Sequence, residues 1–308
     1  MAQTAPIPML DAAATAAALP WTGLVDALRA MLERKAAGCT VAPERLAVPL
    51  PGGLLLAMPA SDGEYASTKL VTVHPGNPER GLPTLLGELL LMRADTGQRL
   101  LILDGPALTA RRTAALSVLA ARTLAPHARG PLLVVGAGIQ GRAHLEAFAE
   151  VQGIRKAFIV SRSRASAEAL AAHGRALGID ARAADSADEV LAQAGVLVTA
   201  TTSTAPVIGE GVRDDAFVAA VGAYRPEMCE LPAPLLYRAR VYVDDPAGAR
   251  HEAGDLIQAG LGWDRVTALE QVVSGAAAPP ANGPVVFKSV GQALWDLAAA
   301  RLALEARR

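Results

Sequence analysis

This sequence of 308 residues has few cysteines and almost no net charge. Only Cys39 and Cys229 occur, far apart and without a C-x-x-C pattern, so neither a disulfide framework nor a zinc site is expected. The five histidines have no ligand spacing, and we therefore predict no metal. A net charge of −1 offers no electrostatic footprint for nucleic acid or for an anionic membrane, so we expect neither as a partner.

Long hydrophobic runs and targeting signals are missing as well. No uninterrupted apolar segment reaches the length of a membrane span. The alanines near the N-terminus are not preceded by basic residues, which argues against a signal peptide. Together with the cysteine usage, these absences predict a cytoplasmic protein. Apolar residues make up 52% of the chain, which is ample for a buried core, and the length favours two domains over one.

The glycine-rich segment 131–149, PLLVVGAGIQGRAHLEAFA, organises the rest of the chain. An apolar strand (132–135) leads into Gly136, Gly138 and Gly141, and a helical pattern follows directly, as in a dinucleotide-binding G-x-G-x-x-G turn. The first glycine allows the tight turn, the second lets backbone approach a pyrophosphate, and the third lets helix pack close to strand. The alternative is an ordinary Ala/Gly-rich turn; the flanking strand and helix favour the dinucleotide site.

The residues after the next expected strand (156–160, KAFIV) suggest which dinucleotide is bound. Ser161, Arg162, Ser163 and Arg164 stand where an NAD-preferring site usually has a carboxylate for the ribose 2′-OH. Two arginines and two hydroxyls suit a 2′-phosphate instead. The alternative is a solvated basic loop in which a serine caps the next helix. We predict NADP(H) as the preferred cofactor, with NAD(H) possible.

The first third of the chain has the pattern of an α+β unit. Residues 20–37 have apolar side chains at helical spacing with charges between them, which predicts an amphipathic helix. Residues 108–124 predict another helix, with Thr109 as a candidate N-cap. His144, on the helix after the glycine turn, is expected at the helix surface. Apolar runs separated by Pro/Gly turns predict strands at 45–51, 53–59, 64–74 and 99–104.

Three cations in this region lie among apolar residues rather than in charge runs: Arg45, Lys69 and Arg112. A buried or half-buried cation needs an anion. For any one of them an ordinary salt bridge or a snorkelling side chain is sufficient explanation. Three together, upstream of a dinucleotide fold, suggest a pocket for a carboxylate substrate.

Several segments in family order carry a resemblance to the ornithine cyclodeaminase/mu-crystallin family, from about Arg45 to the C-terminus. They are KLVTVHPGNPERGLPTLLG, LTARRTAALSVLAARTLA, VVGAGIQGRAHLEA, VTATTSTAPVI, VYVDD and FKSVGQALWDLAAA. The resemblance implies an α/β protein: a Rossmann NADP-binding domain (116–291) and an α+β substrate-binding and dimerisation domain (1–115, completed by 292–308). It also implies a homodimer in which nicotinamide meets a small cyclic imino or amino acid.

The resemblance assigns roles to individual residues. The family's carboxylate-binding cations fall on Arg45, Lys69 and Arg112. Thr201 and Thr202 fall on cofactor contacts, although without the resemblance they fit equally well as strand-end and turn residues. The full set of expected cofactor-binding residues is Gly136, Gly138, Ile139, Gln140, Ser161, Arg162, Arg164, Thr201, Thr202, Ser289 and Val290.

One departure from the family pattern bears on the reaction. Where cyclodeaminases have an Asp and, a few residues on, a Lys, this chain has Tyr224 and Met228 at or next to those positions. Cyclodeamination needs a carboxylate to move protons around the substrate amine, and a tyrosine with a pKa near ~10 is a poor base at neutral pH. Hydride delivery to an imine asks less of the protein. Lys69 would anchor the carboxylate or protonate the nitrogen, and Tyr224 would contact the ring.

The sequence therefore predicts an NADPH-dependent ketimine reductase, converting Δ1-pyrroline-2-carboxylate to proline and Δ1-piperideine-2-carboxylate to pipecolate. Two alternatives stay open. One is an ornithine cyclodeaminase or an alanine-dehydrogenase-like amino-acid oxidoreductase, against which the missing Asp argues. The other is a non-catalytic NADPH-binding, crystallin-like protein, against which the three pocket cations argue.

Overall fold

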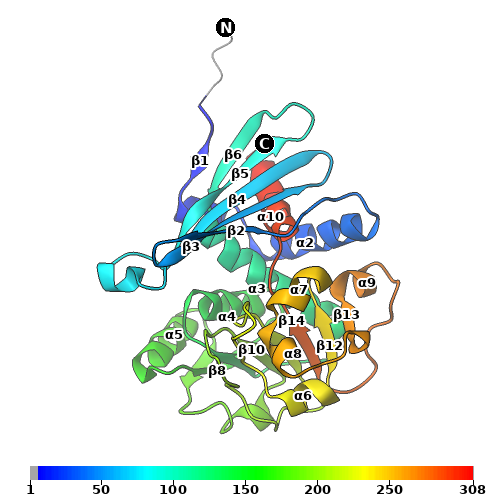
Figure 1. The fold of residues 1–308 in the computed structure, drawn as a ribbon. Coiled ribbons are helices and arrows are strands. Elements are labelled where there is room, and N and C mark those ends of the chain that lie inside the picture. The colour runs from blue at the N-terminus through cyan, green and yellow to red at the C-terminus, as the bar shows by residue number, and fades with distance from the viewer. Residues whose placement is uncertain (1–5, 308) are drawn as a thin grey trace. The chain divides into compact units, whose positions relative to one another are not determined.

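The computed structural model describes residues 6–307. Residues 1–5 and 308, at the ends of the expected substrate domain, lie outside the described residues. The chain divides into two compact units (Figure 1). The first takes in the chain as far as Arg112 and again from Gln292, and the second is Thr113–Gly291. The boundary between Arg112 and Thr113 falls inside one long helix, α3 (Gly105–Leu124).

The first unit is built on a six-stranded sheet in the order β1-β6-β5-β4-β3-β2, antiparallel except for the parallel β1–β6 pair. Inward-facing side chains alternate with outward-facing ones along the strands, as in a sheet covered on one face. Helix α10 packs against the sheet and against α2 (Figure 1). The elements are β1 (Met9–Leu10), α1 (Ala12–Ala17), α2 (Trp21–Ala36), β2 (Leu46–Leu50), β3 (Gly53–Ser61), β4 (Tyr65–Val73), η1 (Asn77–Arg80), β5 (Leu85–Arg93), β6 (Arg99–Asp104) and α10 (Ala293–Glu305).

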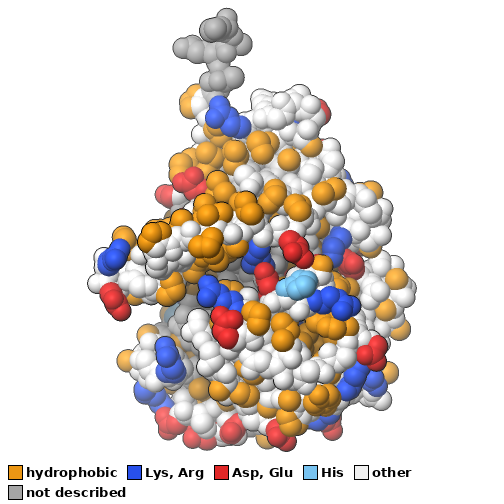
Figure 2. Space-filling model, viewed as in Figure 1, with side chains coloured by type: hydrophobic (Ala, Val, Ile, Leu, Met, Phe, Trp, Pro, Cys, Tyr) orange, Lys and Arg blue, Asp and Glu red, His pale blue; other side chains and the backbone are white. Residues whose placement is uncertain are grey.

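The outer face of this sheet is largely apolar and exposed, with the exposed Glu88 of β5 opposite Leu70 of β4. Strand register aligns Leu46 with Ala57 and Ala57 with Leu70, and in the next row it aligns Val48 with Leu55. Leu46 is 62% and Leu70 48% exposed. Figure 2 shows hydrophobic side chains spread over the strands of this sheet. We call this surface the outer sheet face; its most exposed large apolar side chains are Leu46, Val48, Leu70 and Leu86.

The second unit is an eight-stranded, all-parallel sheet in the order β13-β12-β14-β11-β10-β7-β8-β9. From β7 the chain moves outward to β8 and β9, then returns to β10 on the other side of β7. The topological switch point, where doubly wound sheets bind ligands, thus lies between β7 and β10. The strands are β7 (Leu132–Val135), β8 (Lys156–Val160), β9 (Asp180–Ala183), β10 (Val196–Thr199), β11 (Phe217–Ala220), β12 (Arg240–Val243), β13 (Val266–Ala268) and β14 (Val285–Lys288).

Helices cover both faces of the parallel sheet, which is why its central strands β7, β10 and β11 are buried along their whole length. Helix α4 approaches the face that carries Val134. On the opposite face, Leu133 belongs to a buried cluster with Leu236 of α6 and Leu256 of α8. This confirms the predicted α/β class. The helical segments are α4 (Ile139–Val151), α5 (Arg164–Ala176), η2 (Leu191–Gln193), α6 (Ala233–Arg238), α7 (Pro246–Glu252), α8 (Gly254–Gln258), η3 (Trp263–Arg265) and α9 (Leu269–Val273).

The expected start of α3 was wrong. The helix begins at Gly105, where the Asp104 carboxylate accepts a hydrogen bond from the backbone N–H of Ala107 at 2.7 Å. Pro106 lies in the first turn, where its missing N–H costs nothing. Thr109 is therefore not a cap but an interior helix residue, and its hydroxyl accepts a hydrogen bond from Lys69 Nζ at 3.3 Å. Strands β1 and β5 were not expected from the sequence.

Candidate functional site

The glycine turn has a geometry that side chains would block. Gly136 follows β7 at φ +112°, and a Cβ there would lie 2.4 Å from the carbonyl oxygen of Ala200. A Cβ on Gly141 would lie 1.8 Å from the carbonyl oxygen of Gly136. A Cβ on Gly138 would meet nothing within 4 Å, so this glycine borders open space. Two of the glycines are thus required by packing, and Gly138 is left for the approach of a ligand.

The first turn of α4 keeps backbone donors available. Gly138 is its N-cap, and no side chain of the described residues caps the helix. Its first N–H groups and the positive end of the helix dipole suit a pyrophosphate. The Gln140 side-chain oxygen is buried and has no hydrogen-bond partner within residues 6–307. Ile139 is 68% exposed beside it. The turn, the open space at Gly138 and the unpaired Gln140 fit a dinucleotide.

The two arginines after β8 differ in their surroundings. Arg164 Nη2 contacts Glu168 at 2.9 Å, and Arg164 also pairs with Asp185. Arg162 is exposed and has no ion pair or hydrogen bond among residues 6–307. Ser163 is the N-cap of α5 and accepts from the backbone N–H of Ser166. The structure therefore leaves Arg162 and the half-buried Ser161 free for a phosphate, and holds Arg164 in pairs at the start of α5.

Thr201 lies on the loop after β10 and is held by a buried carboxylate. Glu230 accepts hydrogen bonds from Thr201 N at 2.6 Å and from Thr201 Oγ1 at 2.8 Å. It also accepts from Gly222 N at 2.8 Å and Ala223 N at 3.2 Å, on the loop after β11. Burial raises the pKa of Glu230, opposed chiefly by the Lys288 ammonium. One carboxylate thus joins the loops at the carboxyl ends of two neighbouring strands, while Thr202 is exposed to solvent.

Two further aspartates hold neighbouring parts of this sheet edge. Asp255 accepts from the backbone N–H of Leu231 at 2.9 Å and pairs with the fully buried Lys288, Oδ2 to Nζ, at 2.8 Å. Asp244 accepts from Ser289 Oγ at 2.8 Å and from Val290 N at 3.1 Å. The expected cofactor residues Ser289 and Val290 are therefore buried and fixed by a carboxylate.

The structure brings the expected cations together in the first unit. Lys69 on β4 is 3% exposed and its Nζ lies 2.7 Å from Asp296 Oδ2 on α10. Arg112 Nε lies 3.1 Å from Asp296 Oδ1. Arg45 is half-buried and close enough to Lys69 to act on it electrostatically. Two buried cations thus share one carboxylate, with Arg45 close to them, and this excess of positive charge over Asp296 suits an anionic ligand.

The pKa of Lys69 is lowered from its ordinary value of 10.5 to about 8. Burial is the largest cause, because it penalises the ammonium. Asp296 raises the pKa, while Arg112 and Arg45 lower it further. A lysine with a pKa near neutral pH is suited to give up a proton during a reaction.

Tyr224 lies on the loop after β11, in the Thr113–Gly291 unit, and is half-buried. The Arg225 guanidinium lies 5.6 Å from the centre of its ring. Met228 is 6% exposed, so the position near the family's lysine is occupied here by a buried apolar side chain.

The expectation for His144 was wrong, because this residue is fully buried. Its Nε2 lies 2.9 Å from Ser117 Oγ on α3, and its Nδ1 lies 2.7 Å from the carbonyl oxygen of Gln140. Burial lowers the pKa of His144 to about 4, so it is neutral at pH 7. The helical pattern alone did not reveal that α3 covers this face of α4.

Sequence reasoning did not identify Asp296 and Glu230 as site residues. Each has a signal in the sequence, because each is a lone carboxylate in an apolar setting, ALWDLAAA and MCELPAPLL. A carboxylate in such a setting needs a cation or several N–H donors. The cations that pair with Asp296 come from distant parts of the chain, and the donors to Glu230 are backbone and hydroxyl groups of two loops, neither of which the local pattern indicates.

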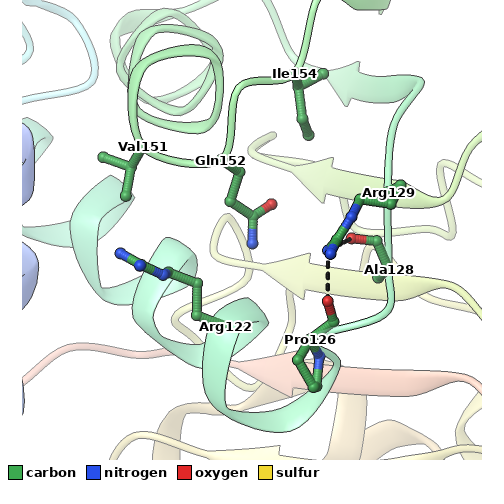
Figure 3. Close-up of a pocket in the computed structure, with 7 residues that line it drawn as sticks. All are labelled: Arg122, Pro126, Ala128, Arg129, Val151, Gln152 and Ile154. Atoms are coloured by element: carbon green, nitrogen blue, oxygen red, sulfur yellow. Dashed lines mark hydrogen bonds between the residues drawn. The ribbon is translucent and has the colours of Figure 1, made fainter.

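A pocket of about 320 Å³ lies elsewhere in the second unit (Figure 3). It is formed where α3 and α4 end and where the chain enters β7, at the opposite end of α4 from the glycine turn. A helix of 13 residues is about 20 Å long, so this pocket is remote from the turn. It contains none of the expected site residues; its lining is Arg122, Pro126, Ala128, Arg129, Val151, Gln152 and Ile154.

The fold and the side-chain clusters define a two-unit α/β protein with a dinucleotide-type turn in one unit and a cationic cluster in the other. Residues 8–307 match the model of the ornithine cyclodeaminase/mu-crystallin family. The chain belongs to this family. Among the described residues, no helix is long and apolar enough to cross a membrane.

Curated relatives match over nearly the full length. The chain is 44% identical to Delta(1)-pyrroline-2-carboxylate reductase 2 of Burkholderia ambifaria, covering 98% of this chain and 97% of that protein. It is 43% identical to the Delta(1)-pyrroline-2-carboxylate/Delta(1)-piperideine-2-carboxylate reductase of Azospirillum brasilense, covering 99% and 98%.

Solved structures share the fold. One is Delta(1)-pyrroline-2-carboxylate reductase of Thermococcus litoralis in complex with NADH and L-proline, at a TM-score of 0.91 and 27% identity over 97% of each chain. Another is an archaeal alanine dehydrogenase dimer with bound NAD, at a TM-score of 0.90 and 28% identity, covering 97% of this chain and 95% of that one.

Proposed function

We propose that this protein is a nicotinamide-dependent reductase of cyclic imino acids that converts Δ1-pyrroline-2-carboxylate to proline and Δ1-piperideine-2-carboxylate to pipecolate. The observation that carries the proposal is the buried cluster of Lys69, Arg112 and Asp296, with Arg45 beside it. The positive charge of this cluster can bind a substrate carboxylate, and Lys69 can act as a proton donor. Relatives at 43–44% identity over nearly the whole chain are reductases of these compounds by name.

The chain's own residues would perform two tasks. Arg45 and Arg112 would hold the substrate carboxylate and so fix the orientation of the C=N bond. Lys69 would give a proton to the imine nitrogen and become neutral. The nicotinamide cofactor, when bound, supplies a hydride to the imine carbon. The C=N bond is thereby reduced to CH–NH, and the lysine recovers its proton from solvent.

The cofactor would be held by the second unit. Backbone N–H groups at the start of α4, approached past Gly138, would bind the pyrophosphate. Gln140, Thr201 and the Ser289–Val290 segment would complete the site. Val290 and Ser289 are fixed by Asp244, and Thr201 is fixed by Glu230, so both loops are held in place before a ligand arrives.

We infer a preference for NADP(H) from the loop after β8. Ser161 and Arg162 are available there, and the loop offers no carboxylate to a ribose hydroxyl. Arg164 is engaged by Glu168 and Asp185, so Arg162 would carry most of the interaction with a 2′-phosphate.

A homodimer would form through the outer sheet face. This face exposes Leu46, Val48, Leu70 and Leu86, with Glu88 beside Leu70, and exposed surfaces rich in apolar side chains and bordered by charge are typical of protein–protein contacts. A second copy of the chain is the expected partner, since the archaeal alanine dehydrogenase of the same fold is a dimer.

NADPH oxidation with Δ1-pyrroline-2-carboxylate tests this function. We expect the native protein to turn over this substrate with NADPH. In Lys69→Ala, kcat should fall by about a hundredfold or more. Arg162→Ala should raise KM for NADPH several-fold and leave KM for NADH unchanged, whereas the matched variant Arg164→Ala should have the smaller effect. Absence of turnover by a protein that binds NADPH would contradict the proposed reaction. Release of ammonia from ornithine would favour a cyclodeaminase instead.

A further inference from the structure

Asp296 makes a contact that the carboxylate clamp does not require. Its two oxygens are divided between two cations: Oδ2 lies 2.7 Å from Lys69 Nζ and Oδ1 lies 3.1 Å from Arg112 Nε. The three side chains are 3%, 6% and 1% exposed, for Lys69, Arg112 and Asp296 respectively. A carboxylate that only competed with the substrate for the cations would weaken binding, so its presence needs another explanation.

A purely structural role for Asp296 would be to fasten α10 to the sheet. A different ion pair already does this at the other end of the helix. Arg301 Nη2 contacts Glu64 at 2.9 Å, and Arg301 also pairs with the buried Asp62. Helix α10 is also buried around most of its circumference, with Trp295 and Leu297 fully buried, which adds further attachment. The attachment of α10 therefore does not depend on Asp296 alone.

We propose that Asp296 is a positioning residue that keeps Lys69 protonated and fixes both Lys69 and Arg112 for the imino acid. The inference rests on the proposed function. With one oxygen on each cation, Asp296 sets the separation of the proton donor from the carboxylate-binding arginine. Lys69 passes its proton to the imine nitrogen, and the resulting neutral amine stays beside Asp296, which favours its reprotonation from solvent.

The surroundings of Lys69 determine the sign of the effect. Asp296 on α10 is its one anionic neighbour within the described residues, while Arg112 on α3 and Arg45 ahead of β2 are cationic. Thr109 accepts a hydrogen bond from Lys69, and the flanking strands β3 and β5 place Met58 and Leu89 opposite it. Removal of the Asp296 charge leaves burial and two arginines acting against the ammonium. The pKa of Lys69, now about 8, must then fall.

The test compares Asp296→Asn with Asp296→Glu and Asp62→Asn. Asparagine has the size of aspartate and keeps an oxygen for Arg112, but its NH2 group stands where Oδ2 faced Lys69, so the negative charge and the acceptor for Lys69 are lost together. We expect the alkaline limb of the kcat/KM profile to move to lower pH by about one unit or more. KM for the imino acid should change less than kcat at pH 8. Asp296→Glu keeps the negative charge, so its alkaline limb should lie closer to that of the native protein than the limb of Asp296→Asn does. Asp62→Asn, which removes a buried charge paired with the same helix, should leave the limb in place.

A second measurement separates this inference from the proposed reaction. The chain has four lysines, Lys35, Lys69, Lys156 and Lys288, so the ¹³Cε signals of labelled lysine can be assigned by Lys69→Arg. The Lys69 signal should titrate near pH 8 in the native protein and at lower pH in Asp296→Asn, with or without activity. An unchanged titration and an unchanged alkaline limb would overturn the role of Asp296. If the native protein shows no turnover but the Lys69 signal still titrates at lower pH in Asp296→Asn than in the native protein, the proposed reaction alone would be overturned.

Discussion

Lys69 illustrates how a single residue acquires reactivity from its surroundings. It lies on a strand whose other inward side chains include Tyr65, Val71 and Val73, so the ammonium is removed from water. Burial of a charge without a partner would be prohibitive, and Asp296 supplies the partner. The balance of these effects leaves a lysine that is charged at neutral pH and gives up its proton more readily than an exposed one.

His144 makes the stability of the protein depend on pH, because it is buried in the neutral form. Its pKa is lowered from 6.5 to about 4 in the folded protein. Between these values the unfolded chain binds the proton and the folded chain does not, so stability falls as the pH drops from 6.5 to 4. A difference of this size corresponds to about 3 kcal/mol at the acidic end.

Urea unfolding of His144→Gln tests this prediction. Between pH 7.5 and 4.5 the native protein should lose roughly 2 to 3 kcal/mol more than the variant, since the variant has no imidazole at this position. The exposed His251 serves as a control, and His251→Gln should follow the native protein. Equal losses in the native protein and in His144→Gln would show that this histidine is not responsible.

At the scale of elements, the β7–α4–β8 unit was predicted with the bounds of both strands correct. The sequence features that predict this unit are local: a short apolar run, the glycines, and a second apolar run. Strand β5 was not predicted, although its sequence LLGELLLMR is mostly apolar, because it lies beyond an irregular Pro/Gly-rich segment and carries Gly87 at φ +147°. That glycine lies against the backbone of β4, a contact determined by strand pairing rather than by the local sequence.

The glycines of the turn predict two distinguishable defects. Gly141→Ala places a Cβ 1.8 Å from the Gly136 carbonyl oxygen, which forces backbone to move and should cost about 2 kcal/mol or more of stability. Gly138→Ala meets no protein atom within 4 Å, so the fold should be retained. Its methyl group would instead occupy the space proposed for the pyrophosphate and weaken NADPH binding by roughly tenfold or more.

Thermal unfolding and NADPH titration of the two variants separate these effects. Gly141→Ala should lower Tm clearly, whereas Gly138→Ala should keep the native Tm in the absence of NADPH and lose most of the stabilisation that NADPH provides. If Gly138→Ala binds NADPH as tightly as the native protein, the glycine turn is not the pyrophosphate site.

At the scale of the whole molecule, the sequence predicted an α/β protein, and this class is confirmed. Residue type suggested that Arg45, Lys69 and Arg112 converge, but spacing could not establish it, since Arg45 precedes β2, Lys69 lies on β4 and Arg112 lies on α3. Asp296 joins them from a helix 184 residues beyond Arg112. Contacts of such sequence separation depend on the packed fold and leave no periodic pattern.

The proposed dimer also belongs to this scale. Leu70→Asp places a charge on the outer sheet face, where an exposed monomer would tolerate it and a buried interface would not. Light scattering should show a change from the mass of two chains to that of one. Leu177→Asp is a matched control, because Leu177 is also 48% exposed but lies on the other unit, and it should stay dimeric. A native protein with the mass of a single chain would contradict the dimer.

The proposed function depends above all on hydride transfer to the imine carbon of a cyclic imino acid held by Arg45, Lys69 and Arg112. Turnover of Δ1-pyrroline-2-carboxylate with NADPH deuterated at C4 of the nicotinamide, followed by mass spectrometry of the product, measures this transfer. We predict proline that carries one deuterium at C2, formed with one NADPH consumed per proline. NADPH that binds without being consumed, or proline without deuterium from either face of the cofactor, would contradict the proposed reaction.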